Sequence, residues 1–170
     1  GVIPCGLGGE HLVSLPLLRA AHKVHPELVL IQFDAHLDLR DDYLGTHLSH
    51  ATVLRRITEF VSPARVLQVG PRSGTREEFQ LSKKLGTYRD SSITPDALRN
   101  WVGDRPLYVT LDLDVLDPSI LPGTGTPEPG GVTFATLEAW IRGLSGCKWI
   151  GWDVVELSPD YDVSQVSSVV

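Results

Sequence analysis

The sequence predicts an α/β fold, a three-layer α/β/α sandwich around a mostly parallel sheet. Short apolar runs alternate with longer amphipathic stretches, and this alternation is typical of a parallel sheet that has both faces covered by helices. A second observation indicates where this fold would carry a functional site. Asp34, Asp112 and Glu156 each directly follow a predicted strand, and ligands of such sheets bind at the carboxyl ends of the strands. We therefore expect one rim of the sheet to carry a site.

The predicted elements follow from the apolar runs and from the stretches between them. Strands are expected at 28–33, 65–69, 107–111 and 148–155, and residues 1–5 form the tail of another. Helices are expected at 12–25, 49–61, 76–85, 95–102 and 134–144. The Pro/Gly-rich stretch 118–131 is expected to be a shaped loop rather than a linker.

Composition limits the class of protein. The 170 residues predict one domain, 1–170. A hydrophobic content of 42% with 21% charged residues excludes a disordered chain. No run approaches the roughly 18 apolar residues of a membrane span, and a net charge of -6 without a basic run argues against nucleic-acid binding. The chain begins at Gly1 without a secretory signal and contains no Met, so we expect truncation at both ends.

The two cysteines predict no disulfide framework. Cys5 and Cys147 also lack the spacing of a zinc site. We expect both to be small buried residues of a protein in the reducing cytoplasm.

Six residues form a candidate metal site. Asp34, His36 and Asp38 occupy alternate positions, which point the same way in an extended segment. Asp112 and Asp114 repeat this spacing after another strand, and His11 follows the turn-forming Gly-Gly-Glu at 8–10. All six histidines of the chain lie within its first fifty residues, so imidazole ligands are concentrated there.

The charge of this set predicts its cofactor. Four carboxylates brought together repel one another unless cations lie between them, and two divalent cations would balance them. Oxygen ligands with some imidazole and no thiolate favour Mn²⁺ over Zn²⁺. An adjacent pair of such ions can activate water at neutral pH, so we expect two Mn²⁺.

Several motifs carry a family resemblance. These are Gly-Gly-Glu-His at 8–11, Phe-Asp-Ala-His-Leu-Asp at 33–38, Leu-Asp-Leu-Asp-Val-Leu-Asp-Pro at 111–118, and the stretches 122–131 and 155–159. They resemble the signatures of the ureohydrolases, the family of arginase and agmatinase. The resemblance implies an arginase/deacetylase-like fold, two Mn²⁺ held by the six residues, and hydrolysis of a guanidino group to urea and an amine. It also implies a homo-oligomer, a trimer or hexamer.

The resemblance also implies roles for residues outside the ligand set. Glu156 matches the glutamate that binds the guanidinium ion, and His50 matches a proton-shuttling histidine, with His47 as a nearby alternative. Thr126 is expected to shape the pocket or to contact the substrate.

Within the family, the sequence is most similar to agmatinases. Arginases use a polar loop where this chain has Leu39–Thr46, and they place an acidic residue where it has Thr75. The stretch 38–43 followed by Arg55 and Arg56 resembles agmatinases instead, and formiminoglutamases usually lack a histidine at the position of His50. An acidic protein would also attract the dication agmatine. Agmatine, cleaved to putrescine and urea, is therefore the expected substrate, and arginine, guanidinobutyrate and guanidinopropionate remain alternatives.

Two other classes of protein remain. A non-catalytic metal-binding relative is possible, although the retention of His50 and Glu156 argues against it. A single-zinc deacetylase on a similar sheet would need neither Asp38 nor both acids of the 112–114 pair.

Overall fold

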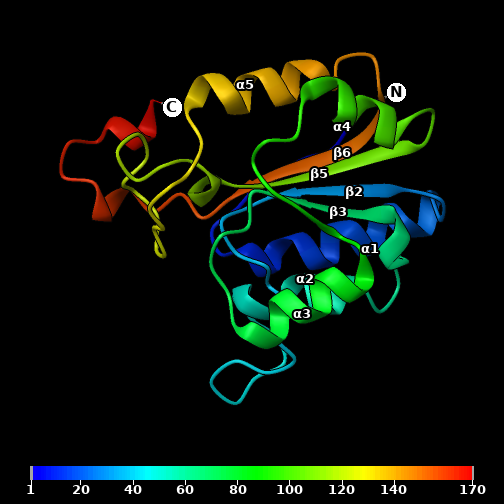
Figure 1. Ribbon diagram of the computed structural model, residues 1–170, viewed down its shortest axis with the longest axis horizontal. Coiled ribbons are helices and arrows are strands. Elements are labelled where there is room, and N and C mark those ends of the chain that lie inside the picture. The colour runs from blue at the N-terminus through cyan, green and yellow to red at the C-terminus, as the bar shows by residue number, and fades with distance from the viewer. Residues whose placement is uncertain (1, 170) are drawn as a thin grey trace.

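The computed structural model describes residues 2–169, which form a parallel sheet in the order β1-β6-β5-β2-β3-β4 (Figure 1). All of its strand pairs are parallel. The strands are β1 (Cys5–Leu7), β2 (Val29–Phe33), β3 (Val66–Val69), β4 (Tyr88–Arg89), β5 (Pro106–Asp112) and β6 (Lys148–Val155). The strands β6, β5 and β2 lie side by side at the centre, so the residues at their carboxyl ends are brought together.

Helices cover both faces of this sheet. The helices α1 (Ser14–Val24), α2 (Val53–Ile57) and α3 (Arg76–Leu85) lie on one face, and α4 (Pro95–Val102) and α5 (Phe134–Gly143) lie on the other (Figure 1). Short 3-10 helices are η1 (His11–Val13), η2 (His50–Thr52), η3 (Pro63–Arg65), η4 (Leu113–Val115), η5 (Pro159–Tyr161) and η6 (Val166–Ser168). The predicted three-layer α/β/α sandwich is confirmed.

Strand β2 supplies side chains to two separate cores, one on each face. Ile31 and Phe33 pack in the core beneath α4 and α5, where the Phe33 ring stacks on Trp140 at 5.4 Å between centroids. Leu30 packs in the core beneath α1 and α2. Because β2 is buried on both faces, its sequence is apolar almost throughout.

Local signals set the ends of α3 and α4. Thr75 and Glu78 form a capping box at the start of α3, and Gly86, with a φ of 74°, ends it in the left-handed region. Thr94 caps α4 and is followed by Pro95 in the first turn. Both helices have the bounds that the sequence predicts.

Three elements differ from the prediction. The helix expected over 49–61 is divided into η2 and the short α2, because the N–H of Arg55 donates to the carbonyl of Asp38 rather than within a helix. The first strand lies at Cys5–Leu7, where it pairs with Trp152–Val154, rather than at 1–5. The two-residue β4 was not expected at all.

The prediction of buried cysteines is wrong for Cys5, which is exposed, while Cys147 is partly buried. Cys5 lies on β1, the edge strand of the sheet that residues 2–169 form. None of the helices within residues 2–169 combines the length and the apolar character that crossing a membrane would require.

Candidate metal centre and substrate pocket

The six predicted metal ligands meet at the carboxyl ends of the central strands. Asp34 follows β2, Asp112 ends β5, and Asp114 lies in η4 directly after it. His11 opens η1, which follows β1 at the same rim. All six are buried except His36, whose side chain is 22% exposed.

These residues form two adjacent groups that share Asp34. In the first group, His11 Nδ1 lies 3.2 Å from Asp34 Oδ2 and 3.3 Å from Asp112 Oδ2. In the second, His36 Nδ1 lies 2.9 Å from Asp114 Oδ2 and 3.6 Å from Asp34 Oδ1. Asp34 therefore turns one oxygen toward each group, as a carboxylate between two cations would.

Asp38 joins the first group, although not by the predicted geometry. Its Oδ2 lies 3.1 Å from His11 Nδ1. The segment 34–38 is not an extended strand with alternating side chains, because Asp38 has a left-handed φ of 53°. Asp34, His36 and Asp38 converge through this turn rather than through the pleat of a strand.

The hydrogen bonds of His11 indicate a cation ligand. Thr110 Oγ1 donates its proton to Asp153 Oδ1 at 2.6 Å, so at 3.0 Å it accepts from His11 Nε2. A neutral His11 then directs the lone pair of Nδ1 at the oxygens of Asp34, Asp38 and Asp112, and this atom has no hydrogen-bond partner within the described residues. Acceptors that face acceptors in a buried site need either a proton or a metal ion between them, so the donor set fits a metal that replaces the proton.

The pKa values of the two histidines reflect the same electrostatics. Burial alone would lower the pKa of His11, but the carboxylates of Asp112, Asp34 and Asp38, which face its Nδ1, raise it well above its usual range. Burial likewise opposes the charge of His36, and Asp114 and Asp34 raise its pKa to about 11. Without a metal, protons on these rings would offset the carboxylates.

The carboxylates divide into two kinds. Burial would raise the pKa of Asp34, but His11 and His36 hold it well below its usual range. Burial raises the pKa of Asp38 and of Asp112, and the negative charges of Asp34 and Asp114 respectively raise them further. Two histidines cannot neutralise four buried carboxylates, so in the absence of a metal Asp38 and Asp112 favour their protonated forms.

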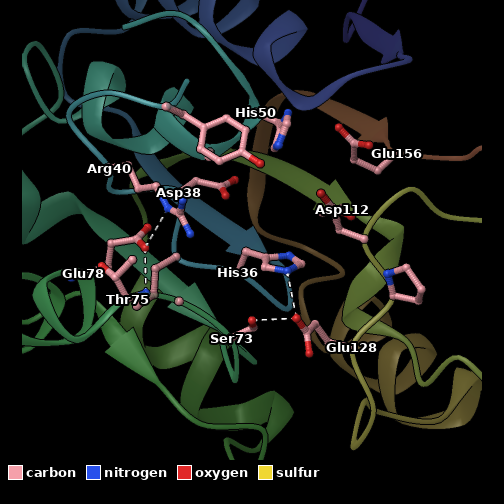
Figure 2. Close-up of a pocket in the computed structure, with 16 residues that line it drawn as sticks. His36, Asp38, Arg40, His50, Ser73, Thr75, Glu78, Asp112, Glu128 and Glu156 are labelled. Carbon is pink, nitrogen blue, oxygen red and sulfur yellow. Dashed lines mark hydrogen bonds and ion pairs between the residues drawn. The ribbon is translucent and has the colours of Figure 1, made fainter. Parts of the chain in front are cut away.

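A cavity of about 350 Å³ opens above the two groups, a volume typical of a small-molecule site. In Figure 2, His50 and Glu156 lie above His36 and Asp112 in this cavity. His50 Nδ1 lies 3.3 Å from Glu10 Oε1, and its ring packs edge-on against Tyr43 at 5.2 Å between centroids. The alternative, His47, lies in an exposed loop and contacts the carbonyl of Asp41.

Glu156 lines the cavity next to His11, and its position is fixed by backbone contacts. Its backbone has a left-handed φ of 65°, and its N–H donates to the carbonyl of Gly9 at 2.8 Å. Oε1 accepts the backbone N–H of His11 at 2.7 Å. Burial raises the pKa of this carboxyl group, so a cationic ligand beside it would favour its ionised form.

The glycine-rich loop 118–131 forms another wall, and Arg72 holds it in place. The guanidinium group of Arg72 donates to the carbonyls of Asp114 at 2.8 Å and Glu128 at 2.7 Å. Thr126 Oγ1 donates to Asp114 Oδ2 at 3.3 Å, so the predicted pocket residue Thr126 lies beside a predicted ligand.

Sequence reasoning missed two acids that line the cavity. Glu128 Oε1 accepts from Ser73 Oγ at 2.7 Å and lies 3.6 Å from His36 Nε2 (Figure 2). Glu78 accepts the N–H groups of Leu39 and Thr75 and pairs with Arg40 at 3.3 Å. The capping-box spacing of Thr75 and Glu78 was a signal for Glu78, but nothing in the sequence placed Glu128 next to His36.

Comparison with known proteins identifies the family. Residues 1–170 match the profile of the arginase family. The chain belongs to that family. It is 44% identical to an agmatinase of Halalkalibacterium halodurans over 98% of its own length and 60% of the relative. It is 39% identical to a guanidinobutyrase of Pseudomonas aeruginosa over its whole length and 57% of the relative.

A solved structure agrees with this relationship. A Clostridium difficile protein provisionally assigned as an agmatinase superposes with a TM-score of 0.93 at 42% identity, covering 98% of this chain and 62% of that one. The chain thus spans about 60% of the length of the curated relatives it matches. Its fold and family follow from these matches, and its activity is argued below.

Proposed function

We propose that this chain carries the active site of a ureohydrolase that cleaves agmatine to putrescine and urea with two Mn²⁺. The observation that supports this most directly is the shared Asp34, which gives two cation-binding groups a common carboxylate below a cavity that also holds His50 and Glu156. The six residues His11, Asp34, His36, Asp38, Asp112 and Asp114 would hold the cations. When bound, such a pair supplies an activated water molecule and stabilises negative charge.

Glu156 would bind and orient the guanidinium group. Oε1 accepts the N–H of His11, which orients the carboxylate, and Glu156 lines the cavity. A carboxylate and a guanidinium ion form strong charge-assisted hydrogen bonds. This contact would hold the guanidinium group in the cavity that His36 and Asp112 also line.

His50 would transfer the proton that the leaving amine needs. Its side chain is 39% exposed, its Nδ1 faces Glu10 Oε1, and it lines the cavity, so it lies between solvent and the space for the substrate. A positioned histidine of this kind contributes general acid catalysis. Thr126, which donates to Asp114, would fix the edge of the pocket on the opposite side.

Charge in the cavity favours a cationic substrate. Glu128 and Glu156 are partly exposed carboxylates in its lining, whereas the one arginine there, Arg40, is paired with Glu78 and lies over the Tyr43 ring at 5.0 Å. A dication such as agmatine would therefore meet more available negative than positive charge. Guanidinobutyrate is the second candidate substrate, because the chain is 39% identical to a protein named guanidinobutyrase.

Urea release by the Mn²⁺-loaded protein tests this proposal, with agmatine, arginine and 4-guanidinobutyrate assayed side by side. We expect urea mainly from agmatine. Glu156→Gln keeps the shape of the side chain and should lower kcat/KM strongly without loss of Mn²⁺. Urea from guanidinobutyrate alone would show that agmatine is not the substrate. If two Mn²⁺ are bound and none of the three compounds yields urea, the proposed ureohydrolase activity is wrong.

We also propose that the protein is a cytoplasmic homo-oligomer, a trimer or a hexamer, which is the assembly that the family resemblance implies. Light scattering after size-exclusion chromatography tests the assembly, and a monomeric mass at micromolar concentration would contradict it.

A further inference from the structure

Two buried glutamines lie behind the metal centre, and the reaction does not use them directly. Gln32 on β2 and Gln68 on β3 are fully buried, and they face each other in the register of these two parallel strands. Both occur in otherwise apolar strands, where an amide is retained only if its hydrogen bonds are satisfied. Their partners therefore indicate what they do.

The orientation of the Gln68 amide is fixed by groups that cannot reverse their role. Gln68 Nε2 donates to the carbonyl of Leu37 at 2.8 Å, and a carbonyl can only accept. On its other side, Gln68 Oε1 accepts from Thr87 Oγ1 at 2.8 Å and from Ser82 Oγ at 3.2 Å. A flipped amide would place oxygen against oxygen at Leu37.

This orientation in turn fixes Gln32. Gln68 Nε2 donates to Gln32 Oε1 at 3.0 Å, so the NH₂ group of Gln32 must point the other way. It donates to Asp34 Oδ2 at 2.6 Å and lies 3.4 Å from Asp38 Oδ2. A directional chain thus runs from the end of α3 through two amides to two predicted metal ligands.

The contact matters because Asp34 is the shared carboxylate. Oδ2, which Gln32 holds, faces the His11 group, and Oδ1, which accepts the backbone N–H of His36 at 2.6 Å, faces the other group. Rotation of the carboxylate would break both hydrogen bonds and spoil both cation sites at once. A neutral amide holds the carboxylate and leaves its negative charge free to attract cations. A lysine at this position would cancel that charge.

We propose that Gln32, oriented by Gln68, is a positioning residue that sets the rotation of the Asp34 carboxylate and thereby the affinity and spacing of the two metal sites. The inference rests on the proposed metal centre. Partners behind a ligand of this kind typically contribute about 10- to 100-fold to metal affinity, and such a loss is large enough to measure.

Mn²⁺ binding to purified Gln32→Met tests the proposal, with the dissociation constants measured by equilibrium dialysis and the metal pair by its electron paramagnetic resonance spectrum. Methionine fills the space without donating a hydrogen bond. We expect both dissociation constants to rise about 10- to 100-fold and the spectrum of the coupled pair to change. Gln68→Met should raise them less, because Gln32 keeps its own bonds but loses the partner that orients it.

The matched control is Ile31→Ala, next to Gln32 on β2. Ile31 is fully buried but packs in the core beneath α4 and α5, so this variant should lower the melting temperature and leave the dissociation constants within about twofold. Wild-type affinity in both glutamine variants, measured below their melting temperatures, would overturn the inference. If Gln32→Met does not fold, unchanged affinity in Gln68→Met overturns it. Failure of the wild type to bind two Mn²⁺ would instead overturn the metal centre itself, and the inference with it.

Discussion

Binding of Mn²⁺ at the proposed metal centre should release protons, because His11 and His36, the two histidines proposed as ligands, are protonated when no metal is present. The pKa of His36 is raised to about 11, so at neutral pH its ring carries a second proton. A histidine must be neutral to bind a metal. The cation therefore replaces a proton at His36, and a second one within the cluster of His11 and its carboxylates.

The magnitude follows from the His36 pKa. About four pH units separate pH 7 from a pKa of about 11, and each corresponds to about 1.4 kcal/mol, so displacing this proton at pH 7 costs the metal about 5 kcal/mol. The apparent affinity should then rise about tenfold per pH unit for each proton displaced. Ordinary histidines would release only about a tenth of a proton each at pH 7.5.

Isothermal titration calorimetry in two buffers of different ionisation enthalpy measures directly how many protons are released when Mn²⁺ binds. We expect two or more protons for each protein chain loaded with two Mn²⁺ at pH 7.5. The control His47→Asn removes an exposed histidine outside the cavity and should leave the number unchanged. A total below about half a proton, with both metals bound, would refute the argument that carboxylates hold these histidines protonated.

Three further predictions concern single residues. His50→Ala should keep both cations and lower kcat about 10²- to 10⁴-fold, as measured by dialysis and urea release, and unchanged turnover would exclude His50 from proton transfer. In the metal-free protein, the raised pKa of His36 adds stability that is complete below pH 6.5 and is lost as pH rises through about 11. Melting temperatures in chelator should therefore fall more over this range than those of His36→Asn, and parallel curves would contradict the shift. Arg72→Met removes a charged donor from the carbonyls of Asp114 and Glu128. It should lower the free energy of unfolding by about 2–4 kcal/mol, which urea denaturation would show as a lower midpoint. An unchanged midpoint would show that the loop does not depend on Arg72.

The sequence predicted those elements whose signals are local. Strand β6 and helices α3 and α4 have their predicted bounds, because apolar runs, caps and a proline at a helix start act over a few residues. The split of η2 from α2 was not predictable, since it depends on the Arg55–Asp38 hydrogen bond between segments apart in sequence. The edge position that exposes Cys5 likewise depends on the order of strands in the sheet.

The sequence predicted which residues make up the candidate site, but not how they are arranged. Side chains that follow parallel strands meet at one rim of the sheet, and the six residues predicted as ligands do so. The left-handed backbone of Asp38, whose side chain joins the His11 group, was not predictable from the spacing of the residues. The glutamine pair was hidden as well, because only the β2–β3 register places Gln32 opposite Gln68.

The attachment of the glycine-rich loop to Arg72 has a consequence for how substrates are selected. A wall fixed to the body of the domain by carbonyl contacts at Asp114 and Glu128 is already ordered before a ligand arrives, so binding carries little entropic penalty for ordering it. A ligand that contacts this loop would then meet a surface whose shape and charge are set in advance by the side chains of Thr126 and Glu128. Under the proposed function, exchange of these side chains would change which guanidino compound binds while the backbone stays in place. An insertion in the loop would instead break the contacts that Arg72 makes to the carbonyls of Asp114 and Glu128.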